Sequence, residues 1–578
     1  MATDPHLLAL GAALERERRA VLVEHESFQA LPLATRRAVG FSSYPLVVDA
    51  LELRSRGRVN VVLRGTDVGD AFHPGDPVTL APVGRPNDGL VARIEGVDDA
   101  TIELRLAEVP EGSGPWCVSR RLDFAWLDGQ VQAIQTGAER RTPLTDLLLG
   151  YERPYRPDPR EHGAFRKLDS AQRAAAELAL GATEIGLVHG PPGTGKTQTL
   201  IAILEALVET GERPWALAES NAAVDQLALK ARTAGLDVVR LGVSARIGSE
   251  VQPLTLEWRI LHGSRAEVIR SLMRQASRAS GPEGVELRDA IRSEWAVAKR
   301  EILGAADVLA MTLGSLATRG RDLAAPRTAV VDEASQIMEP ALWVLAAKVK
   351  RMILAGDPMQ LGPVVKSRDP LLERSLLRRL VDEGFCFPML VQQYRFNDEL
   401  LGLCAPTYGG QLVSHPSVAT STLSPAARWI DTAGMGFDEE PDAAESFHNP
   451  GELQLLQRLY AELVAEGVLA GDVGVVTPYR GQVLRIRAAL PGVEVGSVNA
   501  FQGREKRVIL VSFVRSNPEQ TLGFVADPRR LNVTVTRARD RLILVGDSAT
   551  LGANPHYQRV IDTIAAQGGY QSGWEFMD

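Results

Sequence analysis

The chain has 578 residues, 45% of them hydrophobic and 24% charged, which is enough for roughly three or four globular domains with sizeable cores. No apolar run approaches the ~18 residues that span a bilayer, and the N-terminus lacks a signal-peptide layout, so we expect a cytoplasmic protein and no membrane association. With 64 basic and 72 acidic residues the net charge is −8, which excludes a global attraction to nucleic acid, so any such binding must use a local basic path.

The sequence contains three cysteines, Cys117, Cys386 and Cys404, with no CxxC spacing and no nearby pair of histidines. Disulfide-stapled domains and structural zinc sites both need a denser set of ligands than this one. We therefore expect no disulfide framework and no zinc, as is typical of a protein in a reducing cytoplasm.

The N-terminal part of the chain changes from a helical period to a period of two. From residue 6 to 40, apolar residues recur at helical spacing with charged residues between them, which predicts helix. From about 45 to 108, short alternating runs such as "RVNVVLRG" and "TIELRLAEV" are broken by Gly, Asp, Asn and Pro, which predicts a small antiparallel barrel or sandwich. A helical stretch follows, and then the Pro-rich segment "YERPYRPDPREHG" (151–163) indicates a domain boundary.

From residue 164 onward, strands that are apolar on both faces alternate with helical patterns. "IGLVHG", "TAVVDEA" and "RMILAGD" are examples, and a second set that includes "PMLVQQY", "VGVVTPY" and "RLILVGD" begins near residue 388. Such strands fit a parallel sheet covered on both sides, so we predict an α/β nucleotide-binding domain and a second α/β domain of similar build. Residues 255–304 are charged and helical in pattern, which predicts an insertion in the first of these domains.

A phosphate-binding loop is predicted between the strand "IGLVHG" and the helical pattern that follows. The segment "GPPGTGKT" (190–197) fits GxxxxGK[ST] in the required strand–loop–helix context. Its glycines let backbone N–H groups turn toward a phosphate, and the helix N-terminus adds its positive dipole end. We expect Lys196 to neutralise β- and γ-phosphates and the Thr197 hydroxyl to hold Mg²⁺. The predicted nucleotide-binding loop comprises Gly190, Pro191, Pro192, Gly193, Thr194, Gly195, Lys196 and Thr197.

Two adjacent carboxylates, Asp332 and Glu333, end the apolar strand of "TAVVDEA" and are the natural partners of this loop. We expect Asp332 to ligate Mg²⁺ at the C-terminal end of its strand, and Glu333 to polarise a water for attack on the γ-phosphate. Nothing in the sequence marks a pocket for an acceptor substrate. The pair therefore predicts an ATP hydrolase rather than a kinase.

A series of short motifs lies in a fixed order along the chain and is more specific than the phosphate loop alone. The motifs are "LDSAQRAA" (168–175), "GPPGTGKT" (190–197), "ESNAAVDQL" (219–227), "VLAMTLGSL" (308–316), "VVDEASQ" (330–336), "LAGDPMQLGPVV" (354–365), "QQYRFN" (392–397), "VVTPYRGQ" (475–482), "SVNAFQGREKRVILVSFVRSN" (497–517) and "RRLNVTVTRAR" (529–539). Together they resemble the ordered motif set of the superfamily 1 helicases, and most closely the branch of the nonsense-mediated-decay and immunoglobulin-mu-binding-protein helicases. The resemblance covers nearly the whole chain, most firmly from about residue 165.

The resemblance implies two RecA-like domains that grip one ATP in the cleft between them. By motif position, Gln172 would contact adenine, Tyr394 would stack on it, and Glu505 would contact the sugar. Gln360 would sense the γ-phosphate, and the second domain would contribute two arginine fingers. The implied catalytic residues are Lys196, Asp332, Glu333, Gln360, Arg395 and Arg537. Cations supplied across a cleft act only when it is closed, which couples ATP hydrolysis to domain closure.

The resemblance also implies a track for single-stranded DNA or RNA across the tops of both domains. Hydroxyl and amide groups would hold the phosphates of the strand without reading its sequence. The candidate contacts are Ser220, Asn221, Thr312, Thr477, Tyr479 and Ser497. The barrel would match the accessory barrel that family members place over the strand, although a purely structural domain is the alternative.

The sequence departs from the family pattern at several positions. Glu219 stands where the family usually has Pro, so a carboxylate lies near the implied phosphate track. Gly362 replaces a Pro, Asn499 an Asp, and Arg507 an acidic residue. None of these changes removes a group needed for hydrolysis, so they bear on strand binding and coupling.

The expected fold class is α/β, with two RecA-like P-loop domains, an N-terminal β-barrel accessory domain and a helical insertion. The predicted bounds are 1–44 for the helical segment, 45–125 for the barrel, 126–163 for the helical stalk and linker, 164–387 for the first RecA-like domain with its insertion at 255–304, and 388–578 for the second. The leading interpretation is a monomeric, ATP-dependent helicase or translocase on single-stranded DNA or RNA, moving 5′ to 3′ by analogy with the family branch. The alternatives are an ATP-gated nucleic-acid clamp or ribonucleoprotein remodeller, and an ATPase switch acting on a protein partner.

Overall fold

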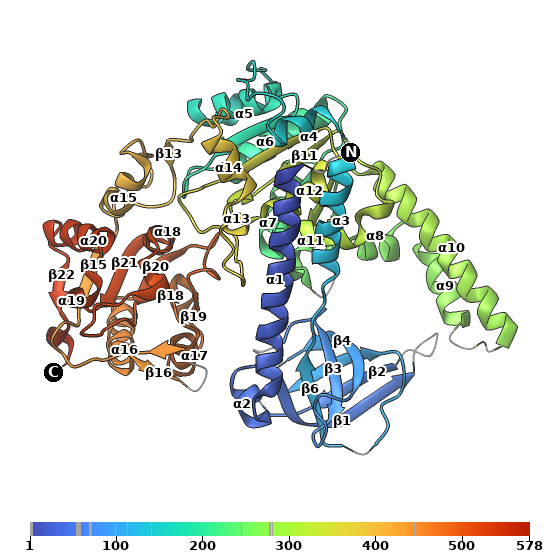
Figure 1. Ribbon diagram of the computed structural model, residues 1–578, viewed down its shortest axis with the longest axis horizontal. Coiled ribbons are helices and arrows are strands. Elements are labelled where there is room, and N and C mark those ends of the chain that lie inside the picture. The colour runs from blue at the N-terminus through green and yellow to red at the C-terminus, as the bar shows by residue number, and fades with distance from the viewer. Residues whose placement is uncertain are drawn as a thin grey trace.

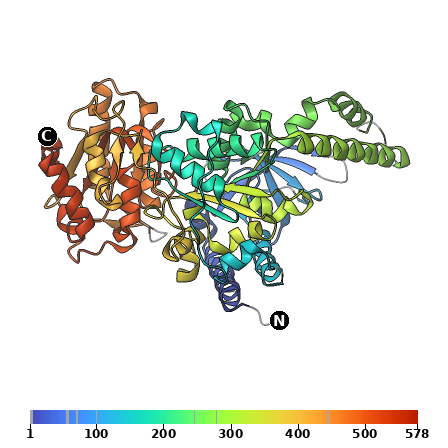
Figure 2. The ribbon, with the colours of Figure 1, turned by 90° about the horizontal axis from the view of Figure 1, so that it is seen from above.

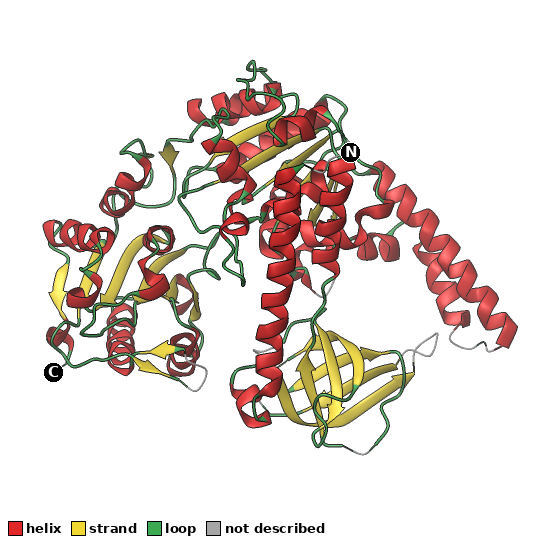
Figure 3. Ribbon diagram, viewed as in Figure 1, coloured by secondary structure: helices red, strands yellow, loops and turns green. Residues whose placement is uncertain are grey.

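The protein is described by a computed structural model that covers residues 4–53, 59–66, 68, 72–98, 100–112, 114–139, 141–243, 246–276, 279, 281–442 and 446–577. These residues form an N-terminal helical segment, a β-barrel and two α/β domains, with a helical arm that projects from the first α/β domain (Figures 1 and 3). In the ranges described, no helix is both long and apolar enough to cross a membrane.

The N-terminal segment is helical, as its spacing predicted, and it packs on the first α/β domain. α1 (Pro5–Ala30) and α2 (Leu33–Ala38) are its two helices. Asp4 caps α1, because its side chain accepts hydrogen bonds from the backbone N–H groups of the first turn. Leu7, Leu10 and Leu14 lie on one face of α1 and are buried in the core of the first α/β domain. α1 thus runs between the barrel and that domain (Figure 1).

Within the described ranges, six strands close into an antiparallel barrel in the order β1-β2-β5-β4-β3-β6. Their bounds are β1 (Ser42–Leu53), β2 (Val59–Arg64), β3 (Pro77–Pro82), β4 (Leu90–Val97), β5 (Thr101–Leu106) and β6 (Trp116–Arg120). The period of two follows from closure, because alternate residues such as Val59, Val61 and Leu63 fill the interior. The barrel alternative of the prediction is confirmed, although β6, which closes the barrel against β1, lies beyond the predicted strands.

The first α/β domain contains a parallel sheet of six described strands in the order β7-β12-β11-β8-β10-β9. Their bounds are β7 (Ile185–His189), β8 (Trp215–Ala218), β9 (Val238–Leu241), β10 (Val308–Thr312), β11 (Thr328–Val331) and β12 (Arg351–Gly356). The associated helices are α3 (Ala125–Glu139), α4 (Pro143–Leu148), α5 (Ser170–Gly181), α6 (Lys196–Glu209), α7 (Asn221–Thr233), α11 (Leu313–Arg319), α12 (Glu339–Ala346), α13 (Pro370–Glu373) and α14 (Leu376–Asp382). Ala329 and Val331 face one core and Val330 faces the other, which explains why these strands are apolar on both sides.

The helical arm consists of α8 (Leu256–His262), α9 (Ala266–Ala276) and α10 (Gly281–Ala305). It extends away from the rest of the molecule (Figure 2). A small core of Ile260, Ile269 and Ala298 joins its helices, and the charged residues that dominate its sequence lie around this core.

The second α/β domain also contains a parallel sheet, in the order β19-β18-β20-β21-β15-β22 for the strands that the structure describes. Their bounds are β15 (Ala427–Asp431), β18 (Val473–Thr477), β19 (Glu494–Ser497), β20 (Lys506–Ser512), β21 (Ala538–Gly546) and β22 (Tyr570–Ser572). The helices are α15 (Asp398–Cys404), α16 (Pro450–Ala465), α17 (Arg480–Ala489), α18 (Pro528–Val535), α19 (Ser548–Leu551) and α20 (Pro555–Ala566). A short hairpin of β16 (Glu440–Pro441) and β17 (Phe447–His448) lies beside α17.

The stretch "PMLVQQY" does not open the second sheet, contrary to the prediction from its apolar pattern. The backbone N–H of His189, at the end of β7, donates to Pro388, and that of Leu390 donates back to His189, so this stretch lines the edge of the first sheet. β13 (Gln392–Gln393) then pairs with β14 (Val413–Ser414) in a separate two-stranded parallel sheet. The run is apolar because it covers an edge strand, and apolarity alone does not show which sheet a strand joins.

A buried ion pair connects the N-terminal helix with the first α/β domain. Arg379 of α14 donates two hydrogen bonds of 2.9 Å to Glu339 of α12, and Nε2 of His6 lies 2.7 Å from the same carboxylate. Glu339 is only 2% exposed. Burial alone would raise the pKa of Glu339, but the hydrogen bond from His6 and the charge of Arg379 lower it to about 2.

We expect Glu339→Gln to lower the free energy of unfolding by about 3 kcal/mol, because the buried Arg379 would lose its buried counter-charge and keep only the more exposed Glu383 as an ionic partner. Urea titration at pH 7 measures this loss, with Glu250→Gln on the exposed surface as the control. The carboxylate has a depressed pKa in the folded state, so its contribution is present above pH 4.5 and is lost as the pH falls toward about 2. The variant should lack this pH-dependent contribution to stability. Unfolding curves equal to those of the wild type would contradict a stabilising role for the Glu339 carboxylate.

Candidate functional site

The loop between β7 and α6 forms a tight turn that depends on its glycines. Gly193 and Gly195 have φ angles of +75° and +76°, in the left-handed region that side chains disfavour. A Cβ on Gly190 would lie 2.6 Å from the Cβ of Lys196, so a side chain there would collide with the lysine. The loop is therefore shaped so that its backbone can approach a ligand closely, at the positive end of α6.

Lys196, the first residue of α6, lies between the two predicted carboxylates. Its Nζ is 2.5 Å from Oε1 of Glu333 and 3.0 Å from Oδ1 of Asp332. Burial alone would lower the pKa of Lys196, but the two carboxylates outweigh burial and raise it. Glu333 has a φ of 53°, a strained backbone conformation of the kind that often marks functional sites. The amine is thus fully charged and is held at the mouth of the loop.

The oxygen groups predicted to hold Mg²⁺ are adjacent to one another. The Thr197 hydroxyl donates to Oδ2 of Asp332 at 3.3 Å, and Asp332 is 4% exposed at the end of β11. A hydroxyl next to a carboxylate is the oxygen donor set that Mg²⁺ prefers when phosphates complete its coordination. The residues present therefore fit this ion.

Residues of the later motif "QQYRFN" contact the phosphate loop directly. The backbone N–H of Tyr394 donates to the carbonyl of Gly193 at 2.8 Å. A Cβ on Gly193 would lie 2.6 Å from the Cβ of Arg395, so that arginine lies directly against the loop. On the other side, Nε2 of Gln172 donates to the carbonyl of Thr194 at 3.0 Å. The structure thus brings the predicted base-contacting residues to the phosphate loop.

The two predicted arginine fingers lie near each other but are held differently. Arg395 pairs with Glu505 at 2.6 Å and donates to the carbonyl of Thr536 at 3.1 Å. Arg537 is 1% exposed, and its guanidinium donates to the carbonyl of Val533 and to the hydroxyl of Thr536. Burial lowers the pKa of Arg537, the charge of Arg395 lowers it further, and the charge of Glu333 opposes this shift.

A buried carboxylate that the sequence prediction missed joins both α/β domains. Asp357 accepts hydrogen bonds from Gln360 at 2.9 Å, from Tyr408 at 2.7 Å and from His189 at 3.1 Å. Asn532 of α18 donates to the Tyr408 hydroxyl at 2.8 Å. Burial alone would raise the pKa of Asp357, but the hydrogen bond and charge of His189 and the Tyr408 hydroxyl lower it. Asp357 belongs to the motif that contains Gln360, whereas nothing in the local sequence singles out Tyr408.

The six candidate nucleic-acid contacts follow or end strands of the two sheets, and all of them except Thr477 have polar side-chain groups engaged within the protein. Ser220 and Thr312 cap α7 and α11, and the Ser497 hydroxyl accepts from the N–H of Ala500 at 3.3 Å. Asn221 accepts a hydrogen bond of 2.9 Å from Arg240.

The two remaining candidates are buried. Thr477 is 0% exposed, and Tyr479 is 6% exposed beneath Phe447 and Phe524. Glu219, which precedes Ser220 in the chain, is an exposed residue. Desolvation of its carboxyl group by the surrounding protein raises its pKa to about 7. As contacts for a strand, all six residues remain predictions.

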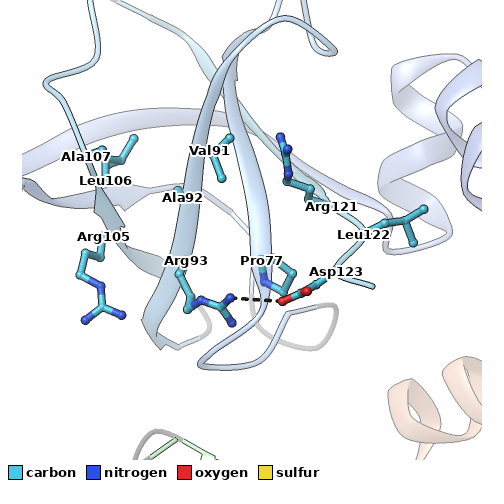
Figure 4. A pocket seen from close by; sticks show the side chains of 10 residues that line it. All are labelled: Pro77, Val91, Ala92, Arg93, Arg105, Leu106, Ala107, Arg121, Leu122 and Asp123. Carbon is cyan, nitrogen blue, oxygen red and sulfur yellow. Dashed lines mark hydrogen bonds and ion pairs between the residues drawn. The ribbon is translucent and has the colours of Figure 1, made fainter. Parts of the chain in front are cut away.

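The barrel carries a separate cavity of about 520 Å³ near its junction with α3 (Figure 4). Arg93, Arg105 and Arg121 line it, and Arg93 pairs with Asp123 at 3.4 Å. Arg105 pairs with Glu95 at 3.1 Å. This surface is a local concentration of basic groups on a chain whose net charge is −8.

Family models and curated relatives agree on the class of protein. Two models described as AAA domain match residues 167–281 and 261–368, and residues 372–549. DNA-binding protein SMUBP-2 of Rattus norvegicus is 33% identical over 479 residues, which are 75% of this chain and 48% of the rat protein. DNA polymerase alpha-associated DNA helicase A of Schizosaccharomyces pombe is 33% identical, over 67% of this chain and 64% of its own. ATP-dependent helicase NAM7 of Saccharomyces cerevisiae is 34% identical, over 69% of this chain and 43% of its own.

The chain spans about half the length of the curated relatives it matches, from 43% to 64% for these three. The matched region nevertheless contains the phosphate loop, the strand-end carboxylates and the predicted arginine fingers, Arg395 and Arg537. The chain therefore belongs to the superfamily 1 helicases, in the Upf1-like group.

Proposed function

We propose that the chain is an ATP-dependent helicase or translocase that couples ATP hydrolysis to the closure of two RecA-like domains, residues 164–387 and 388–578. The observation that carries this proposal is the contact of Arg395 with Gly193 of the phosphate loop. A cation that one domain supplies to a phosphate held by the other stabilises the transition state only when the cleft is closed. Hydrolysis and domain position are then linked.

The residues around Lys196 supply the hydrolytic chemistry in this proposal. Lys196 and the N–H groups of the loop bind the β- and γ-phosphates, and Thr197 and Asp332 hold Mg²⁺. When bound, Mg²⁺ neutralises developing charge on the phosphate oxygens. Lys196 turns from Glu333 toward the phosphate, which frees Glu333 to accept a proton from the attacking water. The short pairing of Lys196 with Glu333 supports this exchange of partners.

The residues of the cleft wall position the nucleotide and stabilise charge. Tyr394 stacks on the base, Gln172 contacts its edge, and Glu505 contacts the ribose. Arg395 and Arg537 act as arginine fingers on the transferring phosphoryl group. The ion pair between Arg395 and Glu505 supports a coordinated change, because a bound nucleotide offers each of them a new partner.

The buried carboxylate Asp357 connects the γ-phosphate sensor with the second domain. Gln360 and Tyr408 donate to the same oxygen, Oδ2, from opposite sides of the cleft. When Gln360 turns to a γ-phosphate, that oxygen loses one donor and the contact with Tyr408 changes in strength. This shared acceptor supports a direct route from nucleotide state to domain position.

We propose that single-stranded DNA or RNA crosses the carboxyl ends of both sheets, along the candidate contacts at Ser220, Thr312 and Ser497. Residues 45–125 act as the accessory barrel, residues 126–163 as its stalk, and residues 255–304 as an inserted arm. The three arginines that line the cavity on the barrel, two of them paired with carboxylates, support a role in holding phosphates. Movement from 5′ to 3′ is proposed by analogy with the family branch.

The decisive experiment measures ATP turnover with poly-DNA and poly-RNA single strands side by side, followed by unwinding of 5′-tailed and 3′-tailed duplexes. We expect a single strand to stimulate turnover and a 5′-tailed duplex to be separated. Stimulated turnover and strand protection without duplex release would replace the helicase with an ATP-gated clamp. Turnover that no strand of either kind stimulates would overturn the proposal in favour of a switch acting on a protein partner.

A further inference from the structure

Two aromatic rings lie side by side next to the phosphate loop because two short strands end at the same edge. β13 leads into Tyr394 and β14 leads into His415, and the pair is held by the N–H of His415, which donates to the carbonyl of Gln393 at 2.8 Å. The ring centroids of Tyr394 and His415 are 4.8 Å apart, with 30° between the ring planes. This is a stacked geometry at a centroid distance that is favourable for aromatic pairs.

Tyr394 is fixed at both ends by residues of the first α/β domain. Its backbone N–H donates to Gly193 at 2.8 Å, and its hydroxyl donates to Asp169 at 2.9 Å. Asp169 in turn caps the helix that carries Gln172. The phenol ring therefore spans from the phosphate loop to the residue beside the proposed base-contacting glutamine, and 37% of Tyr394 is exposed.

His415 is fixed just as firmly on one face of that ring. Its Nδ1 accepts a hydrogen bond from the backbone N–H of Ser417 at 3.2 Å and lies 2.7 Å from the Ser417 hydroxyl. Because Nδ1 is an acceptor, the neutral imidazole carries its proton on Nε2. The backbone pairing and the contacts with Ser417 hold the imidazole in place, so a nucleobase has access to Tyr394 only from the opposite face.

We propose that His415 is a positioning residue for nucleotide binding, which backs the ring of Tyr394 so that its free face stacks on the base of a nucleoside triphosphate. This inference rests on the proposed function of the ATP site. The imidazole limits the rotation of the phenol ring and extends the stack from two rings to three. Stacking is blind to the hydrogen-bonding edge of the base, so His415 contributes to the affinity for any base-bearing triphosphate and nothing to that for a base-free polyphosphate.

The test compares binding of ATP and of inorganic tripolyphosphate to the wild type and to His415→Ala, by equilibrium titration, with KM and kcat for ATP in parallel. We expect His415→Ala to weaken ATP binding about two- to tenfold, the range for one aromatic stacking contact. Binding of tripolyphosphate and kcat at saturating ATP should be unchanged. His415→Phe keeps a stacking ring and should restore ATP affinity.

His262→Ala is the matched control, because His262 stacks on Trp258 with centroids 4.0 Å apart in the helical arm, and it should leave ATP binding unchanged. Equal ATP affinity in His415→Ala and the wild type would overturn the inference while leaving the proposed function intact. Equal weakening of ATP and tripolyphosphate would also overturn it, because the effect would then not involve the base. If the His415→Ala effect on ATP affinity is found but the wild type hydrolyses no ATP, the proposed function alone is refuted. If the wild type binds no ATP, both proposals are refuted.

Discussion

Glu333→Gln should bind ATP at least as tightly as the wild type and hydrolyse it about 10²–10⁴-fold more slowly, the range for loss of a general base. The substitution keeps the size of the side chain and removes only its charge. It also removes the 2.5 Å ion pair with Lys196. The amine therefore no longer has to break that ion pair before it binds a phosphate. Lys196 retains Asp332 at 3.0 Å, so the local fold keeps one of its two ion pairs.

Single-turnover hydrolysis and equilibrium binding of ATP separate these two effects for Glu333→Gln. Glu161→Gln, on the exposed linker, is a charge-matched control that should behave as the wild type. A Glu333→Gln variant with normal turnover would remove Glu333 from the reaction. A variant that lost both binding and turnover would assign Glu333 to nucleotide binding instead.

Central strands of both sheets, such as β12 and β18, were predictable from sequence because they are buried on both faces. Between Thr328 and Asp332, and between Arg351 and Asp357, the runs contain none of the alternating polar residues that a half-buried strand would show. The phosphate loop was also predictable, because its turn needs positive φ angles that glycine adopts most easily. Gly193 and Gly195 have such angles. Such requirements involve only a few neighbouring residues, so the sequence pattern shows them directly.

Contacts between distant segments were harder to predict from the same sequence. β6 contributes only "WCVSR" to the barrel, between Pro115 and Arg121, so its pairing with β1 leaves little local signal. Tyr408 ends a short 3-10 helix and His415 follows the two-residue strand β14, both too short to show a periodic pattern, and their partners Asp357 and Tyr394 lie elsewhere in the chain. Tyr479 was predicted to contact nucleic acid from its motif alone. The motif does not reveal that Phe447 and Phe524 cover its ring.

Arg537→Ala should reduce kcat about 10³–10⁵-fold while changing ATP affinity far less, because an arginine finger acts on charge that develops in the transition state. Within the described residues, the donors of Arg537 meet backbone carbonyls and a hydroxyl rather than a carboxylate. Those neutral acceptors fix the orientation of the guanidinium without neutralising it. Arg395, by contrast, must first give up Glu505.

Arg537 is buried, so removing its side chain can disturb the fold as well as remove a charge from the site. The experiment therefore needs variants that separate a loss of charge from a loss of fold. Arg537→Lys keeps a positive charge but loses the planar fork, and it should recover only part of the rate. Arg539→Ala, two residues further along the chain and exposed, should hydrolyse ATP normally. Strand affinity and thermal midpoint, measured for all three, identify any loss of fold. If Arg537→Ala keeps the kcat of Arg539→Ala, Arg537 is not an arginine finger, and the link between turnover and domain closure would rest on Arg395 alone.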